Sequence, residues 1–264
     1  MYKILASTAS ADSAMKLRDS IEKQLGMKAK SILVSKSSSK SNGNTVILRY
    51  GCSYGHLDNE PYWGDPTFSE LCINKLATAN ALRGLVRVPE FFNDHRPTEW
   101  PVLLRSTLTG CASEGITLCH NVEDMRKAWK TGSYWTPFIQ HSMEIRVLAV
   151  FNEDKETAKR IYKKVPRDSD ESSSEEFVAG LGGEDNTKWL LKEIAAYPKV
   201  VRIIENIEDT IIGLDGTFVA FDMIYSDVEK DWVVLEMNSG PWLSLPAAEW
   251  LARLFIRDNG SIFK

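Results

Sequence analysis

The stretch FVAFDMIYSDVEKDWVVLEMNS, residues Phe218 to Ser239, carries the clearest structural signal in the sequence. Thr217 to Tyr225 is rich in β-branched and aromatic residues, and Trp232 to Met237 is a nearly continuous apolar run, as is typical of β-strands. Ser226 to Asp231 consists of turn formers and charged residues. The stretch therefore predicts two β-strands joined by a polar turn.

Three polar side chains belong to these predicted strands. Asp222 interrupts the first strand, and Glu236 and Asn238 stand two residues apart in the second, so they project from the same strand face. A buried carboxylate is costly unless it is paired or bound to a cation, and oxygen ligands of this kind suit Mg²⁺. The alternative from spacing alone is that Asp222 and Glu236 are ordinary strand-end residues that face solvent or pair with Lys or Arg.

Composition limits the classes of function. The 264 residues suffice for one large domain or for two or three small lobes, and the net charge of -4 argues against sequence-independent binding of nucleic acid. No apolar run approaches the roughly 20 residues that span a bilayer, and MYKILASTASADSAMK lacks the apolar segment of a signal peptide, so we expect a cytoplasmic protein without membrane contact. The four cysteines show no CxxC spacing, which predicts reduced thiols and no zinc site.

The N-terminal part predicts alternating strands and helices. Tyr2 to Ala6 and Thr45 to Tyr50 have the composition of strands, whereas Ala11 to Leu25 and Pro66 to Leu85 have helical apolar spacing. Lys75 lies within the second predicted helix, where a lysine is usually a solvated side chain. Its position alone does not select it as a functional residue.

A loop rich in Ser, Thr and Gly follows the next strand. Val102 to Leu104 predicts a strand that continues into Arg105, and Ser106 to Gly115 forms the loop before a strand at Ile116 to Cys119. Small residues with free N–H groups suit a flap over phosphates, although the loop lacks the GK[ST] signature of a Walker loop. The alternative is an ordinary hairpin loop.

The second half predicts helices at Asn121 to Lys130, Val200 to Ile212 and Pro246 to Asp258, and another that begins at Asn186 and runs through TKWLLKEIAA. In the predicted strand that starts at Glu144, this residue and Arg146 share a face and can point at a ligand or at each other.

A short basic strand follows in this half of the chain. It ends in Lys163 and Lys164 and leads into the acidic, serine-rich segment Arg167 to Glu176, which we expect to be a mobile loop. Beside a nucleotide site, a basic strand that leads into such a loop would form a lid; alone, it is a solvated run of charge.

The order of these segments resembles the ATP-grasp family over roughly Ile47 to Ser244. The resemblance rests on NK within a helix, VPEF, PVLLR, FIQHSMEIRV, YKK, GLDGTFVAFDMIY and VVLEMNSGP, in that order. The similar members are carboxylate–amine ligases, which include D-alanine:D-alanine ligase and the glutamate ligases that act on protein C-termini, and compact proteins often encoded by bacteriophages. This implies an α+β ATP-grasp fold: a small N-terminal α/β domain (1–85), a small lobe with a Gly-rich flap (86–140) and a C-terminal lobe with the metal site (141–264). The nucleotide cleft would lie between the two α+β lobes.

The resemblance also implies roles for individual residues. Asp222, Glu236 and Asn238 match the family's ligands for Mg²⁺, with Mn²⁺ as an alternative metal. The other matching positions would contact ATP: Lys75, Arg105 and either Lys163 or Lys164 on the phosphates, Phe138, Ile139 and Gln140 as a hinge beside adenine, and Glu144 on the ribose.

Three positions depart from the family pattern. Arg105 replaces the usual Lys, so a rigid fork stands where a flexible point charge is expected. Ala220 stands where ligases of the D-alanine type carry an Arg for the reaction intermediate, and SGP replaces SPG after Asn238. Arg146 could take over the missing role, which makes Arg146 and Lys163 the candidate catalytic residues.

The implied activity is an ATP-dependent ligation: a carboxylate becomes an acyl phosphate and then joins an amine, with release of ADP and phosphate. The alternatives are an ATP-binding scaffold or regulator without turnover, and an ATP-grasp kinase. The partners would be ATP and small-molecule or peptide carboxylates and amines, whose identity is beyond the sequence. A homo-oligomer is open, and a phage-encoded protein would act in the host cytoplasm.

Overall fold

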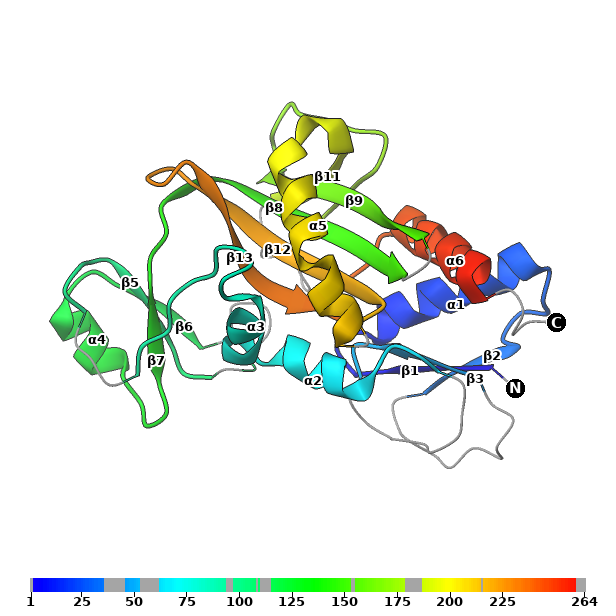
Figure 1. The fold of residues 1–264 in the computed structure, drawn as a ribbon, viewed down its shortest axis with the longest axis horizontal. Helices are drawn as coiled ribbons and strands as arrows, with labels where there is room; N and C mark the ends of the chain where they lie inside the picture. Colours follow the sequence, from blue (N-terminus) through cyan, green and yellow to red (C-terminus); the bar gives the residue numbers. More distant parts are fainter. Residues whose placement is uncertain are drawn as a thin grey trace.

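The computed structural model describes residues 2–35, 46–52, 62–93, 97–107, 109, 115–152, 155–178, 187–214 and 216–259. These residues form a four-stranded, a six-stranded and a three-stranded β-sheet. The three-stranded sheet lies at one end of the molecule, and the four-stranded sheet at the other (Figure 1). No helix among the described residues is long and apolar enough to cross a membrane.

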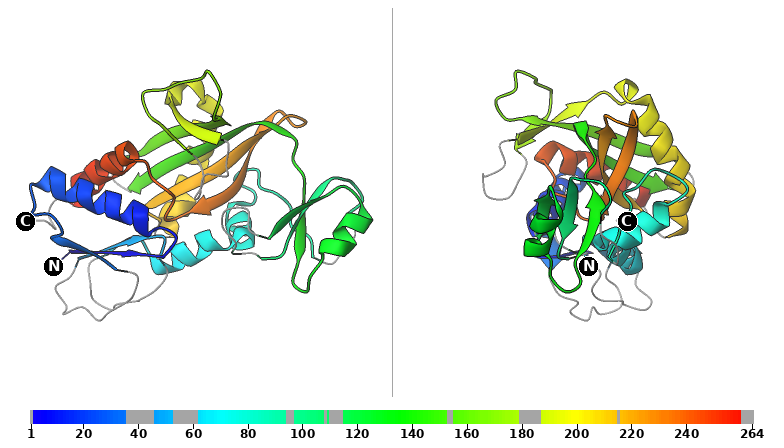
Figure 2. Two further views of the ribbon diagram at one scale, coloured as in Figure 1. Left: turned by 180° about the vertical axis from the view of Figure 1, so that it is seen from behind. Right: turned by 90° about the vertical axis from the view of Figure 1, so that its left-hand side faces the viewer.

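The N-terminal sheet is parallel and has the order β2-β1-β3-β4. Helix α1 (Ala11–Leu25) follows its first strand, and helix α6 (Leu245–Asn259), from the other end of the chain, packs beside α1 between this sheet and the six-stranded sheet (Figure 2). The apolar residues of both helices and both sheets form one shared core. The strands are β1 (Tyr2–Ala6), β2 (Ile32–Ser35), β3 (Val46–Tyr50) and β4 (Tyr62–Trp63).

The six-stranded sheet is antiparallel, with the order β10-β11-β9-β8-β12-β13. Helix α5 (Pro198–Gly213) covers one face with Val200, Ile204, Ile207 and Ile211, while α1 and α6 cover part of the other. The strands are β8 (His141–Asn152), β9 (Lys155–Pro166), β10 (Glu176–Val178), β11 (Thr187–Lys192), β12 (Phe218–Ser226) and β13 (Asp231–Asn238). The predicted strand pair is therefore confirmed as β12 and β13.

The three-stranded sheet has the order β6-β5-β7 and packs on the short helix α4 (Val122–Ala128). Its strands are β5 (Val102–Arg105), β6 (Ile116–Cys119) and β7 (Tyr134–Pro137). Asn121 caps α4, because its side chain accepts from the N–H groups of Glu123 and Asp124. Most of the predicted flap, at positions 108 and 110–114, lies outside the described residues.

Two predicted helices differ from the structure. The helix expected at Pro66 to Leu85 is divided into α2 (Pro66–Ile73) and α3 (Lys75–Leu82), because the Asn74 side chain accepts from the N–H groups of Leu76 and Ala77 and so starts a new helix. The helix expected through TKWLLKEIAA is wrong: its first part is strand β11, followed by a 3₁₀ turn (Ile194–Ala196). Pairing with β9 and β10 satisfies the β11 backbone and buries Trp189 and Leu190, which overrides the local preference.

The basic strand and the acidic segment after it also differ from expectation. Strand β9 extends over twelve residues rather than forming a short strand. The acidic segment is tied to the sheet, because Glu171 pairs with Lys163 at 2.6 Å and Lys192 at 3.0 Å, and buried Glu175 accepts from Tyr162 Oη at 2.8 Å.

Candidate active site

A β-bulge in β13 determines which face of the sheet the predicted metal ligands occupy. Asp222 lies opposite Glu236, but the next pair is Met223 and Val234, so Leu235 has no partner in β12. The extra residue changes which face the following side chains occupy. Val234 therefore packs into the core beneath α5, while Glu236 joins Asp222 on the opposite face.

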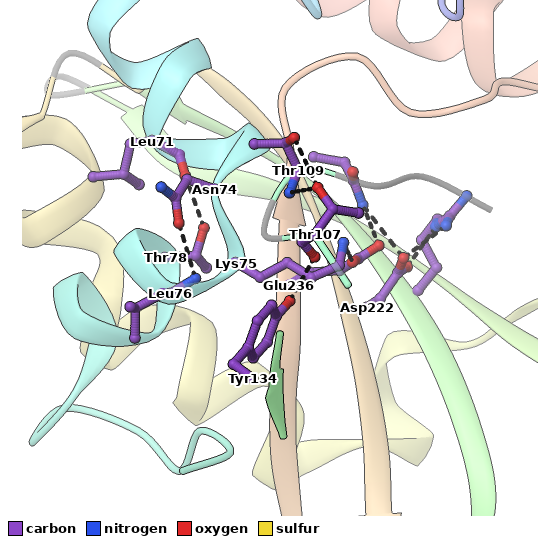
Figure 3. Close-up of polar contacts among 12 residues, drawn as sticks. Leu71, Asn74, Lys75, Leu76, Thr78, Thr107, Thr109, Tyr134, Asp222 and Glu236 are labelled. Atoms are coloured by element: carbon purple, nitrogen blue, oxygen red, sulfur yellow. Dashed lines mark hydrogen bonds and ion pairs between the residues drawn. The ribbon is translucent and has the colours of Figure 1, made fainter. Parts of the chain in front are cut away.

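Each of the two carboxylates is paired with a cation. Arg146 forms a bidentate pair with Asp222, at 2.6 Å from Nε to Oδ1 and 2.8 Å from Nη2 to Oδ2. Lys75 reaches from the first turn of α3 to Glu236, with 2.5 Å between Nζ and Oε2 (Figure 3). The Asn238 amide nitrogen donates to both acids, at 3.3 Å to Asp222 and 3.2 Å to Glu236. The three predicted metal ligands thus lie within reach of one another.

Strand alternation places further charged residues on the same face. In β8, Leu148 and Val150 lie in the core under α1 and α6, and Arg146 and Glu144 continue this face along the strand. In the neighbouring β9, Lys164 lies opposite Glu144, and their charged groups are 3.4 Å apart. Three acidic and three basic side chains therefore pair one to one on this face.

Lys163 lies on the other face of the sheet. Its cross-strand neighbour is Ile145, which packs into the core beneath α5, and its Nζ pairs with Glu171. The predicted site residues therefore separate: Lys164 joins the cluster around Asp222, whereas Lys163 does not.

The ion pairs shift the ionisation of their members. Burial raises the pKa of Glu236, but Lys75 and the amide of Asn238 together lower it by more, so this pKa lies below its ordinary value. Burial lowers the pKa of Arg146, but the Asp222 carboxylate raises it above its ordinary value. Both groups are therefore charged at neutral pH.

Trp189 is a member of the site that the sequence did not reveal. It is buried on β11, with the Arg146 guanidinium 5.0 Å and the Lys164 ammonium 5.8 Å from the centre of its ring. A cation over an aromatic face is stabilised electrostatically, so the indole helps to hold both cations in place. Assignment of its segment to a helix concealed this role, because only the strand pairing of Trp189 with Lys164 brings them together.

Comparison with solved structures identifies the architecture. No protein family model and no curated protein sequence matches the chain. The D-Ala:D-Ser ligase VanG from Enterococcus faecalis aligns over 96% of this chain and 97% of its own, with a TM-score of 0.64 and 11% identity. N5-carboxyaminoimidazole ribonucleotide synthetase from Thermotoga maritima aligns over 91% of this chain and 68% of its own, with a TM-score of 0.61 and 15% identity. The chain has the ATP-grasp fold.

A further likeness reaches almost the whole chain. D-alanine–D-alanine ligase from Bacillus anthracis aligns over 99% of this chain and 96% of its own, with a TM-score of 0.61 and 12% identity. The expected α+β class and ATP-grasp architecture are therefore confirmed.

Within the ATP-grasp fold, the small sheet approaches the acidic pair. Arg105 and Tyr134 are direct neighbours across β5 and β7, and Tyr134 Oη donates to the Thr107 carbonyl at 2.9 Å (Figure 3). Burial and Glu236 raise the pKa of Tyr134, while Arg105 lowers it, so the phenol stands within electrostatic reach of both. The buried Nε of Arg105 makes no hydrogen bond within the described part of the chain, which suits a group that meets an anionic ligand.

The predicted hinge connects the small sheet to the large one. Phe138 N donates to the Pro101 carbonyl at 3.1 Å, and Asp227 N donates to the Gln140 carbonyl at 2.9 Å. Between them, the Ile139 carbonyl lies 2.8 Å from His141 Nδ1. Backbone bonds to the residue before β5 and to the residue after β12 thus hold the connection that leads into β8.

The donor set fits a hard divalent cation. Two carboxylates and one amide gather on one face, and oxygen groups of this kind are those that bind Mg²⁺. No group of three His, Cys, Asp or Glu side chains that could hold a metal occurs in the described ranges, so the third protein ligand would be the Asn238 amide.

Proposed function

We propose that this protein is an ATP-dependent ligase that activates a carboxylate as an acyl phosphate and joins it to an amine. The observation that carries the proposal is the pair Asp222 and Glu236, opposed across two strands on one face, with Asn238 between them and Lys75, Arg146 and Lys164 around them. The aligned solved structures bear the names of ligases and of a synthetase, which supports this class of reaction.

ATP would lie along this face of the sheet. We assign the adenine to the hinge at Phe138, Ile139 and Gln140, and the ribose hydroxyls to Glu144. Lys75, Arg105 and Lys164 would bind the phosphates. Lys164 is preferred over Lys163 because it shares a face with Glu144 and Arg146, whereas Lys163 faces the opposite core.

Asp222, Glu236 and Asn238 would hold Mg²⁺, or Mn²⁺ in its place. Such an ion, when bound, neutralises the phosphate oxygens during phosphoryl transfer. Lys75 and Arg146 now neutralise the same carboxylates, and the triphosphate would attract both cations. The two carboxylates would then bind the metal while the two cations bind the triphosphate. Every charge would therefore stay compensated when the nucleotide and the metal enter together.

The reaction needs no protein nucleophile. A carboxylate oxygen of the substrate would attack the γ-phosphorus of ATP and break its bond to the bridging oxygen, which leaves with ADP. The amine nitrogen would then attack the acyl carbon, phosphate would leave, and the amine would lose a proton. Basic side chains supply charge neutralisation and positioning for both steps.

Arg146 is the proposed substitute for the arginine that is missing at position 220. Ala220 lies two residues before Asp222 on the same face and is fully buried in the core under α6. Arg146 lies directly across from Asp222 on β8. Its fork can therefore approach the intermediate that a residue at position 220 would otherwise contact.

The test uses hydroxylamine as a general amine. The protein is incubated with Mg²⁺, ATP and pools of amino acids, small carboxylic acids or peptides, and hydroxamate, ADP and phosphate are measured. A ligase forms all three in equal amounts, and only when a carboxylate is present. A stable phosphorylated product without hydroxamate would indicate a kinase, and ATP binding without ADP formation for every pool would indicate a scaffold.

A further inference from the structure

A cavity of about 480 Å³ lies away from the paired charges of the candidate active site. Three basic side chains, Arg87, Lys199 and Arg202, and one acidic side chain, Asp231, line it together with apolar groups that include Leu85 and Trp232. None of the residues assigned above to ATP or metal belongs to its lining. It therefore requires an explanation of its own.

Three segments build this cavity on the α5 side of the six-stranded sheet. Residues 84–87 follow α3 and run beside β13, where Val234 N donates to the Arg87 carbonyl at 2.9 Å. Lys199 and Arg202 are three residues apart in the first turns of α5, so they share a side of that helix. Trp232, at the start of β13, belongs to the core beneath α5.

The positive charges here are only partly neutralised. Arg87 pairs with Glu229 at the rim. Lys199 lies 3.9 Å from Asp231 and its side chain is 64% exposed, so this contact contributes little. Arg202 makes no ion pair with any described residue. A guanidinium and a loosely held ammonium thus stand together on a chain whose net charge is -4.

The apolar part of the lining is also partly open to solvent. Leu85 is 41% exposed, although it is a large aliphatic residue, and Ile203 is half-buried beside it. Small-molecule sites combine an apolar surface with a few polar groups, and they have volumes of roughly 300 to 1,000 Å³. This cavity is open to solvent on one side, and it has a volume in that range and the same mixture of apolar and charged groups.

We propose that this cavity binds an anion with an apolar body. A carboxylate, phosphate or sulfonate group would lie on Arg202 and Lys199, whose donors suit oxyanions. The apolar body would cover Leu85 and Ile203, beside the buried Trp232. The proposal is independent of the proposed ligase activity, because the two sites share no lining residue.

Anilinonaphthalene sulfonate is a suitable probe, because it joins an aromatic body to an oxyanion and fluoresces when its surroundings become apolar. It is titrated into the full-length native protein and into R202E and K199E, whose folding is checked by circular dichroism. R253E is the matched control, because it makes the same charge change at an exposed position of α6. The titrations are repeated with saturating Mg²⁺ and ATP to separate this cavity from the nucleotide site.

We expect saturable binding to the native protein and to R253E, unaffected by ATP, and weaker binding by at least about tenfold in R202E and K199E, since a hydrogen bond to a charged group contributes roughly this factor. Absence of binding to the native protein, equal binding to all four proteins, or displacement by ATP would each overturn the proposal.

Discussion

Lys75, the first residue of α3, lies with its Nζ 2.5 Å from Oε2 of Glu236, near the end of β13. The side chains are 15% and 27% exposed, so the pair is largely shielded from water. Lys75 therefore compensates the very carboxylate that we assign to the metal. Glu236 is thus paired with a cation that, under the proposed function, would bind the phosphates.

This pairing predicts weak metal binding in the absence of nucleotide. In K75M the Glu236 carboxylate loses its cation and becomes available, so Mn²⁺ alone should bind at least about tenfold more tightly than to the native protein. Electron paramagnetic resonance of free Mn²⁺ measures this directly. K163M removes a lysine on the opposite face and should bind Mn²⁺ as the native protein does. Equal Mn²⁺ affinity in all three proteins would show that Lys75 does not compete with the metal.

The two neighbouring lysines of β9 should differ in their effect on ATP. K164A removes a cation from the face that carries Glu144 and Arg146, and we expect the dissociation constant of Mg-ATP to rise about tenfold or more. K163A loses only the pair with Glu171 and should leave this constant unchanged. Calorimetric titration compares them. A larger effect of K163A would mean that ATP binds the face that carries Lys163, contrary to the proposal.

Glu175 and Glu171 should contribute unequally to stability, although both belong to the acidic segment and only three residues separate them. Glu175 is 7% exposed and accepts from Tyr162, Arg160 and Ser244, so E175Q leaves a partly buried arginine without its counter-charge. We expect a loss of about 3 kcal/mol, against about 1 kcal/mol or less for E171Q. Urea unfolding measures both, and similar losses would mean that Glu175 does not anchor the acidic segment.

The same segment gives a prediction about pH. Hydrogen bonds from Lys163 and Lys192 lower the pKa of Glu171 below its ordinary value. A lowered folded-state pKa stabilises the fold above the unfolded pKa of about 4.3, and this contribution is lost as the pH falls through the folded value. The difference in unfolding free energy between the native protein and E171Q should therefore be largest near neutral pH and disappear in acid. A difference that grows on acidification would have the wrong sign.

The sequence predicted the strand pair because its residues carry the signal locally. Both strands are apolar, and the turn between them is polar, so β12 and β13 follow from composition. The break between α2 and α3 also has a local signal, because Asn is a preferred capping residue. The apolar spacing of Pro66 to Leu85 predicted one continuous helix, whereas Asn74 places Lys75 at the start of α3.

The arrangement of the site depended on pairings that local sequence does not encode. The bulge at Leu235 turns Glu236 toward Asp222, and nothing in VVLEMN reveals which residue lacks a partner. The choice between Lys163 and Lys164 required the register of β9 against β8. Trp189 entered the site only because β11 pairs with β9, which a helical interpretation of its segment excludes.

The most direct test of the ligase assignment compares the native protein with E236Q in the hydroxylamine assay, once a carboxylate that supports turnover is known. We expect the native protein to form ADP and hydroxamate in equal amounts, and E236Q to form neither while it remains folded by circular dichroism. Native-like turnover by E236Q, or ADP formation by the native protein without any hydroxamate, would contradict the account.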